Sequence, residues 1–189
     1  MRAHRLLVAH QSIEEVLYEP GCPLCRFLKD FQAIHLQKDS AKEIHNLCNF
    51  HTWGLAAVQD APAAAEVFIR LLNNDAEQPA GEKLACDVCR KVEAEEELRI
   101  RELVTLLGKP QVLHWLRMEA VFCMPHATKL HQKVSLILAP RISTIITNYR
   151  QQLKDELLQL RDEPGRDRSG WGALGRAAEF LVAQRGLRT

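Results

Sequence analysis

The sequence has no long hydrophobic run and little net charge of either sign. No apolar run approaches the roughly 18 residues that a membrane-spanning helix needs, so we expect no membrane span. The formal net charge is +1, and the basic residues are interleaved with acidic ones, so a nucleic-acid interface is not expected. Residues 1–20 lack the pattern of an export signal, because their apolar stretch is short and is followed by two glutamates. This predicts a cytoplasmic location.

Motifs of common catalytic sites are also missing. The chain has no glycine-rich phosphate loop, no GxSxG nucleophile motif and no HExxH zinc motif. A metal-dependent hydrolase would need an open coordination position and a general base. Glu43 and Glu119 are available acids, but nothing in their spacing indicates that role. We therefore predict no enzyme and identify no small-molecule substrate.

Cysteine, by contrast, occurs in a repeated pattern. All six cysteines belong to four motifs, CxxC at 22–25 and 86–89 and CxxH at 48–51 and 123–126. Residues i and i+3 share one face of a helix or tight turn, so each motif presents two ligand side chains together. Three thiolates and one imidazole form a common tetrahedral set for Zn²⁺. The candidate metal ligands are Cys22, Cys25, Cys48, His51, Cys86, Cys89, Cys123 and His126.

The order CxxC then CxxH occurs twice, which predicts two Cys3His zinc sites on a duplicated helical unit. The simplest grouping places one site in each repeat, with Cys22 and Cys25 joined to Cys48 and His51. The spacing leaves a second grouping open, in which the repeats exchange halves. Cys22 and Cys25 would then share an ion with Cys123 and His126.

Other chemistry for the same cysteines stays open. Three cysteines and one histidine can hold an iron–sulfur cluster. A CxxC pair can also act as a redox dithiol, although that role is typical of a βαβ setting and the sequence shows no convincing strand. Plain burial as small apolar side chains is a further alternative. His45 and His114, each shortly upstream of a CxxH motif, are the next candidate ligands.

Hydrophobic residues recur at helical spacing along the chain, which predicts an all-α bundle. We expect a single metal-binding domain over 1–160, made of one unit at about 10–75, a second at about 80–136 and a long helix at about 140–160. A linker at 161–170 and a short amphipathic helix at 171–189 follow. A helix carrying Ile44 and Leu47 is expected to lead to Cys48. The terminal helix presents Leu174, Leu181 and Val182 either to the bundle or to a partner.

The combination of motifs resembles a family of uncharacterised bacterial proteins that is known only as a domain of unknown function. The matching features are the CPLC of residues 22–25, the LCxxH of 47–51, the second CxxC, the FCxPH of 122–126 and the Trp-led AAEFLVAQRG near the C-terminus. The likeness covers roughly residues 10–186. It implies paired Cys/His positions and a helical fold, and it implies no activity, substrate or partner.

These observations together predict a zinc-binding helical protein with two structural sites. Its expected role is an interaction or regulatory module that binds a protein partner or a second copy of itself. The alternative is a redox or iron–sulfur sensor that uses the CxxC cysteines.

Overall fold

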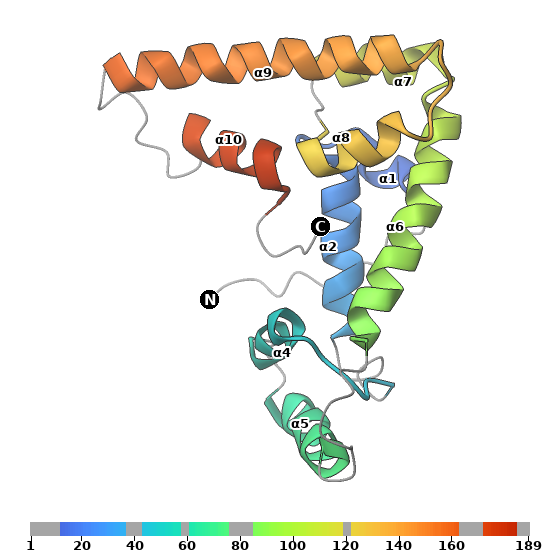
Figure 1. The fold of residues 1–189 in the computed structure, drawn as a ribbon, viewed down its shortest axis with the longest axis vertical. Coiled ribbons are helices and arrows are strands. Elements are labelled where there is room, and N and C mark those ends of the chain that lie inside the picture. The colour runs from blue at the N-terminus through green and yellow to red at the C-terminus, as the bar shows by residue number, and fades with distance from the viewer. Residues whose placement is uncertain are drawn as a thin grey trace. The chain divides into compact units, whose positions relative to one another are not determined.

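The computed structural model describes residues 12–36, 43–57, 61–75, 85–118, 122–162 and 172–184. Within these ranges the chain forms nine helices and no strand (Figure 1), which confirms the predicted all-α class. None of those helices is both long and apolar enough to cross a membrane. The predicted unit boundary near 73–81 and the predicted linker lie largely outside the described residues, so the domain arrangement stays a prediction.

The described chain divides into two compact units, and one of them is assembled from separate stretches of sequence. Unit I contains residues 28–97, and unit II contains residues 12–27 together with 98–184. The division falls within two helices, α2 (Pro23–His35) and α6 (Asp87–Leu106). The units therefore do not correspond to consecutive halves of the sequence.

Unit I consists of the C-terminal part of α2, α4 (Asn49–Ala56), α5 (Ala61–Asp75) and the N-terminal part of α6. Helices α4 and α5 pack against each other. A Cβ atom at Gly54 would lie only 3.2 Å from Leu36 Cδ1, so α4 approaches this leucine closely because residue 54 has no side chain. The buried apolar residues of the unit are Leu28, Leu36, Ile44, Leu55, Ala64, Val67, Val88 and Val92.

One predicted helix of unit I is wrong over the residues that can be compared. Residues 44–48 are not helical, and Cys48 has an extended conformation (φ −77°, ψ 164°) directly before α4. The expected start of that helix at residues 39–40 lies outside the described residues. Ile44 is nevertheless buried, as an apolar anchor of the extended segment. The physical reason is that backbone N–H groups of this segment bond to a side-chain carboxylate of α6 instead of to helical carbonyls.

Unit II contains five helices besides its parts of α2 and α6. They are α1 (Glu14–Leu17), α7 (Pro110–Met118), α8 (Met124–His131), α9 (Ala139–Asp162) and α10 (Ala173–Val182). Their core includes side chains with almost no exposed surface: Ile13, Leu17, Leu24, Leu103, Leu107, Leu116, Phe122, Leu130 and Ile142.

A polar network attaches the start of α1 to α6. The N–H of Ile13 donates to Glu102 Oε1 at 3.2 Å, and Arg99 donates to the other carboxylate oxygen at 2.7 Å. The Arg99 guanidinium also lies 4.5 Å from the centre of the Phe27 ring, within range of a cation–π interaction. This network satisfies a backbone donor that the short helix α1 leaves unbonded.

Helix α9 carries the predicted apolar stripe, and Ile142, Ile145, Ile146 and Leu153 are buried. Both α8 and α10 contact α9 and each other. Figure 1 shows these two helices lying along the same side of the long helix. The stripe therefore forms core packing within unit II.

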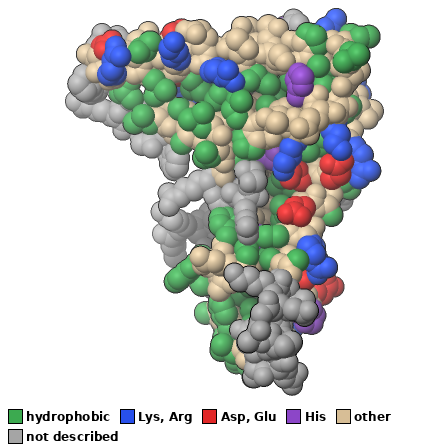
Figure 2. All heavy atoms as spheres, in the orientation of Figure 1, with side chains coloured by type: hydrophobic (Ala, Val, Ile, Leu, Met, Phe, Trp, Pro, Cys, Tyr) green, Lys and Arg blue, Asp and Glu red, His purple; other side chains and the backbone are tan. Residues whose placement is uncertain are grey.

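Helix α10 packs on the bundle through Phe180, and the predicted residues Leu174, Leu181 and Val182 stay at the surface, so their contact with a partner stays a prediction. Phe180 is 4% exposed, whereas Leu174, Leu181 and Val182 are 66%, 62% and 67% exposed. The Phe180 ring contacts Tyr149 of α9, with ring centroids 5.5 Å apart. Hydrophobic side chains accordingly gather on the visible surface over α10 (Figure 2).

This arrangement predicts different effects for two neighbouring apolar residues. Phe180→Ala should lower the free energy of unfolding by about 3 kcal/mol, because it empties a packed site. Leu181→Ala should change it by less than about 0.5 kcal/mol, because its side chain is exposed. Urea unfolding followed by circular dichroism measures both. Equal losses in the two variants would contradict the observed packing of α10.

Candidate metal centres

The structure gathers the eight predicted side chains into two groups of four. Site A comprises Cys22, Cys25, Cys123 and His126, and site B comprises Cys48, His51, Cys86 and Cys89. Within each group all ligand atoms lie within 4.8 Å of one another, so each group could hold a metal ion. Site A lies in unit II and site B lies in unit I.

The grouping within repeats is therefore wrong, and the exchanged grouping is the one found. Each CxxC motif lies at the N-terminal end of a helix, α2 or α6, and the CxxH motif of the same repeat follows only after that helix has ended. Helices of 13 and 20 residues are about 20 and 30 Å long at 1.5 Å per residue. The length of each helix therefore separates the CxxC motif from the CxxH motif of the same repeat.

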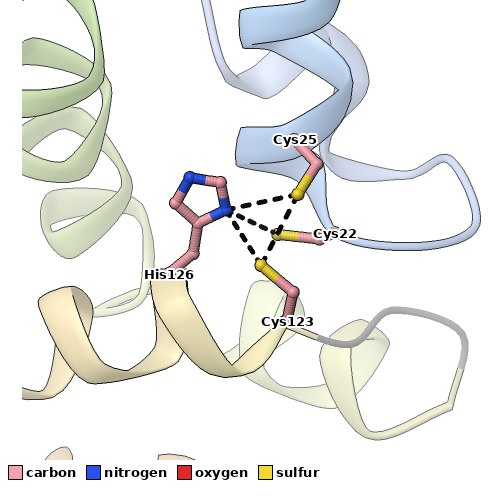
Figure 3. Close-up of side chains that lie close together, drawn as sticks. All are labelled: Cys22, Cys25, Cys123 and His126. Atoms are coloured by element: carbon pink, nitrogen blue, oxygen red, sulfur yellow. Dashed lines mark hydrogen bonds between the residues drawn. The ribbon is translucent and has the colours of Figure 1, made fainter. Parts of the chain in front are cut away.

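In site A, three sulfurs surround one imidazole nitrogen (Figure 3). His126 Nδ1 lies 3.4 Å from Cys22 Sγ, 3.3 Å from Cys25 Sγ and 3.1 Å from Cys123 Sγ. The Cys25 and Cys123 sulfurs are 3.5 Å apart. A tetrahedral zinc with its usual bond lengths separates its ligand atoms by roughly 3.5–3.8 Å. The donors of site A are therefore arranged closely enough to bind a single ion of that size.

Site B has the same arrangement with slightly wider spacing. His51 Nδ1 lies 3.4 Å from each of the sulfurs of Cys48, Cys86 and Cys89. The Cys48 and Cys89 sulfurs are 3.8 Å apart. All six cysteines of the chain are free thiols, and these sulfur separations far exceed the disulfide bond length of about 2.05 Å.

Turns and helix ends position the donors of site A. Gly21 has φ +94°, a conformation that favours glycine, and it directs the chain into α2 at Cys22. Pro23 opens the helix, where its fixed φ is compatible with the first turn. Arg26 donates to the carbonyl of Pro20 at 2.6 Å and pairs with Glu19 at 2.7 Å. Arg26 therefore holds the turn before the motif.

The second half of site A begins α8. Cys123 is its N-cap residue in an extended conformation, and its carbonyl accepts the N–H of Ala127 at 2.8 Å. Cys48 has the same place before α4, where its carbonyl accepts the N–H of Thr52 at 2.9 Å. Both CxxH motifs thus set the cysteine at the positive end of a helix dipole. The hydrogen bond with Cys22 and burial nevertheless raise the pKa of Cys123.

An aspartate inside the second CxxC motif organises site B. Asp87 Oδ2 accepts the backbone N–H groups of His45 and Asn46, each at 2.8 Å. The N–H of Asp87 donates in return to the carbonyl of Asn46 at 3.0 Å, and Arg90 pairs with the other carboxylate oxygen. Burial raises the pKa of Asp87, but the bonds from His45, Arg90 and Asn46 outweigh it and hold the pKa below its ordinary value.

Asp87 is the functional residue that sequence reasoning missed. Its contacts fix the extended segment that leads to Cys48 against the N-terminus of α6, which carries Cys86 and Cys89. The available signal was an acidic residue in the first turn of a helix within a CxxC motif. His45 uses its backbone here, and neither His45 nor His114 belongs to either group of four.

A glutamine orients the histidine of site B. His51 is 1% exposed, and its Nε2 lies 3.1 Å from Oε1 of Gln32, which is also buried. The amide oxygen can only accept a hydrogen bond, so Nε2 carries the hydrogen and the Nδ1 lone pair faces the three sulfurs. This is the tautomer that a metal requires, held by a hydrogen bond to the ligand's second nitrogen.

The crowded thiols shift one another's pKa. Hydrogen bonds with Cys123 and Cys22, together with burial, raise the pKa of Cys25. Burial also raises the pKa of Cys22, but bonds from Cys123, Cys25 and His126 outweigh it and leave that pKa well below its usual value. In site B, burial and the neighbouring thiols raise the pKa of Cys89 to about 12. Crowded thiols resist ionising together, and a divalent cation among them reverses that effect.

Asp87→Ala should loosen site B. The N–H groups of His45 and Asn46 lose their acceptor, which we expect to cost about 2 kcal/mol of stability. Hydrogen exchange of these two amides, with urea unfolding of the whole chain, provides the measurement.

Glu43→Ala is the control, because Glu43 belongs to the same stretch but makes only an exposed ion pair with Lys91 at 2.6 Å. Its loss should leave the free energy of unfolding nearly unchanged, because the ion pair is exposed to solvent. If the His45 and Asn46 amides exchange equally slowly in Asp87→Ala and in the parent chain, Asp87 does not hold this segment.

Comparisons of the chain with protein-family models, with curated proteins and with solved structures found no match. The resemblance to an uncharacterised bacterial family, carried by the Cys/His motifs, therefore stays a prediction.

Proposed function

We propose that the chain is a zinc protein with two structural Cys3His sites that hold its helical segments together. The observation that carries this proposal is the convergence of all six cysteines and two histidines into two groups of four. Thiolate and imidazole donors in a tetrahedral arrangement suit Zn²⁺ better than the hard, oxygen-preferring cations. In each group the imidazole nitrogen lies nearly equidistant from the three sulfurs, which is the arrangement expected of four ligands around one ion.

The donor count supports a structural rather than a catalytic role. Structural zinc sites take four protein ligands, whereas catalytic sites keep one position open for water or substrate. Each group here supplies four, and both histidines are 1% exposed or less. Zinc binding at such sites is worth about 10–16 kcal/mol in small peptides at neutral pH, as much as the whole stability of a domain.

The compactness of each group favours a single ion over a cluster. Ligands of an iron–sulfur cluster bind different iron atoms and so are spread over a wider volume, whereas all donors here lie within 4.8 Å of one another. A single iron ion would fit the same cage. The colour of the purified protein separates that alternative from zinc.

We further propose that the zinc-stabilised bundle is an interaction module for a protein partner or a second copy. Large apolar side chains remain at the surface of both units. Trp53 and Leu72 are 72% and 70% exposed in unit I, and Leu136 and Ile137 are 92% and 74% exposed in unit II. Closed sites leave no coordination position for a substrate, and exposed apolar side chains are a common means of protein recognition.

Metal analysis of designed variants tests both the ion and the exchanged grouping. The parent chain should contain two zinc atoms by elemental analysis and by native mass spectrometry in the presence of a competing chelator. Cys22→Ser with Cys25→Ser should leave one. Adding Cys123→Ser should still leave one, because it belongs to the site already lost. Adding Cys86→Ser instead should leave none.

Grouping within repeats would leave no zinc in either triple variant, because Cys86 and Cys123 would then belong to the same remaining site. The variant with Cys123→Ser therefore distinguishes the two groupings. A brown, iron-containing protein or a metal-free one would overturn the zinc assignment itself.

A further inference from the structure

A cavity of about 510 Å³ adjoins site A within unit II. All three cysteines of the site contribute to its wall, and residues of α9 and α10, including Gln152 and Phe180, contribute to the rest. Small-molecule sites in proteins typically have volumes of about 300–1,000 Å³. A small molecule in this cavity can therefore approach the cysteines of site A.

The three sulfurs differ in how far they can be reached. Cys25 and Cys123 are each 2% exposed, whereas Cys22 is only partly buried. Cys22 also lies at the very start of α2, directly after the glycine turn. Cys22 is therefore the least buried of the three cysteines of site A that line the cavity.

We propose that Cys22 is a modification site at which small, uncharged α,β-unsaturated carbonyl compounds alkylate the zinc-bound thiolate from this cavity. The inference rests on the proposed zinc occupancy of site A, because the ion keeps Cys22 in the nucleophilic thiolate form. Cysteines buried in structural sites are normally inert, whereas Cys22 is only partly buried and lines an open cavity. Cys48 and Cys89 of site B are also partly buried and are therefore the competing targets.

The charges around the cavity favour uncharged reagents. Arg176 pairs with Glu156, and Arg26 pairs with Glu19, so both arginines are neutralised locally. Glu179 adds a negative charge to the lining. Zn²⁺ bound by three thiolates and a neutral imidazole has a net charge of −1, which adds a second negative charge beside the cavity. A carboxylate reagent would be repelled, and a neutral one would not.

The reaction needs no further reactant than water. The Cys22 sulfur forms a bond to the β-carbon of the alkene, the electron pair of the C=C bond moves to the carbonyl as an enolate, and the α-carbon then takes a proton from water. The product is a thioether, which is a far weaker zinc ligand than a thiolate. Site A then keeps three strong donors and holds its ion more weakly, so that a competing chelator removes it, while site B keeps all four.

N-ethylmaleimide added in limiting amount to the zinc-loaded full chain is the test. Peptide mapping by mass spectrometry should find Cys22 labelled several-fold faster than any other cysteine, and native mass spectrometry should show one zinc ion lost with each label. Iodoacetamide is neutral and iodoacetate is negatively charged. The ratio of the iodoacetamide rate to the iodoacetate rate should be larger at Cys22 than for free glutathione, and Glu179→Gln should lower the ratio at Cys22.

Two neighbouring glutamines of α9 provide a matched pair of variants. Gln152 lines the cavity, whereas Gln151 is not among its lining residues. Each makes a similar exposed hydrogen bond, Gln152 to Glu156 and Gln151 to Asp155. Gln152→Trp should narrow the cavity and slow labelling of Cys22 several-fold, whereas Gln151→Trp should not. Both variants should retain two zinc ions, which shows that they fold.

The outcomes separate this inference from the proposed function. A chain without zinc overturns the proposed function and this inference with it. A chain with two zinc ions overturns this inference alone if Cys48 or Cys89 of site B is labelled first, or if Gln152→Trp and Gln151→Trp react equally at Cys22.

Discussion

Two clusters of thiol and imidazole groups hold together segments that are far apart in the chain, and the rest of the structure depends on that constraint. Site A joins Cys25 to Cys123, 98 residues away, and site B joins Cys48 to Cys89, 41 residues away. Short helices such as α1, α4 and α8 are marginal by themselves. Each cage fixes a helix start, so a metal ion would stabilise helices that their own propensity does not.

The two cages are alike in donors but differ in their surroundings. In site B, Asp87 fixes the segment leading to Cys48 and Gln32 fixes the imidazole of His51, so both halves are held by groups that bind no metal. Site A adjoins a cavity, and the buried Ala183 that packs on its cysteines has φ +71°, a strained conformation for alanine. Asp87 and Gln32 thus position the ligands of site B, whereas site A adjoins a cavity and a strained residue.

The eight candidate ligands and the all-α class could be predicted because they depend on local rules, namely the i, i+3 spacing of ligand pairs and the helical period of apolar residues. The grouping could not be decided, because it depends on where α2 and α6 lead the chain, and motif spacing does not report that. The role of Asp87 could not be predicted, because it depends on hydrogen bonds from His45 and Asn46, which lie in a segment that was predicted to be helical. For α10, both Phe180 and Leu181 fit an apolar face, and only the contact with Tyr149 decides which is buried.

The exchanged grouping has a consequence for assembly that the grouping within repeats would lack. The loop closed by site B, from Cys48 to Cys89, lies wholly inside the loop closed by site A, from Cys25 to Cys123. Once site B is closed, the free chain that site A must close shortens from 98 to about 60 residues, which lowers the entropy cost by about 0.5 kcal/mol. Side-by-side loops would give no such coupling. Nested sites therefore favour an order in which the inner site forms first and the outer site follows.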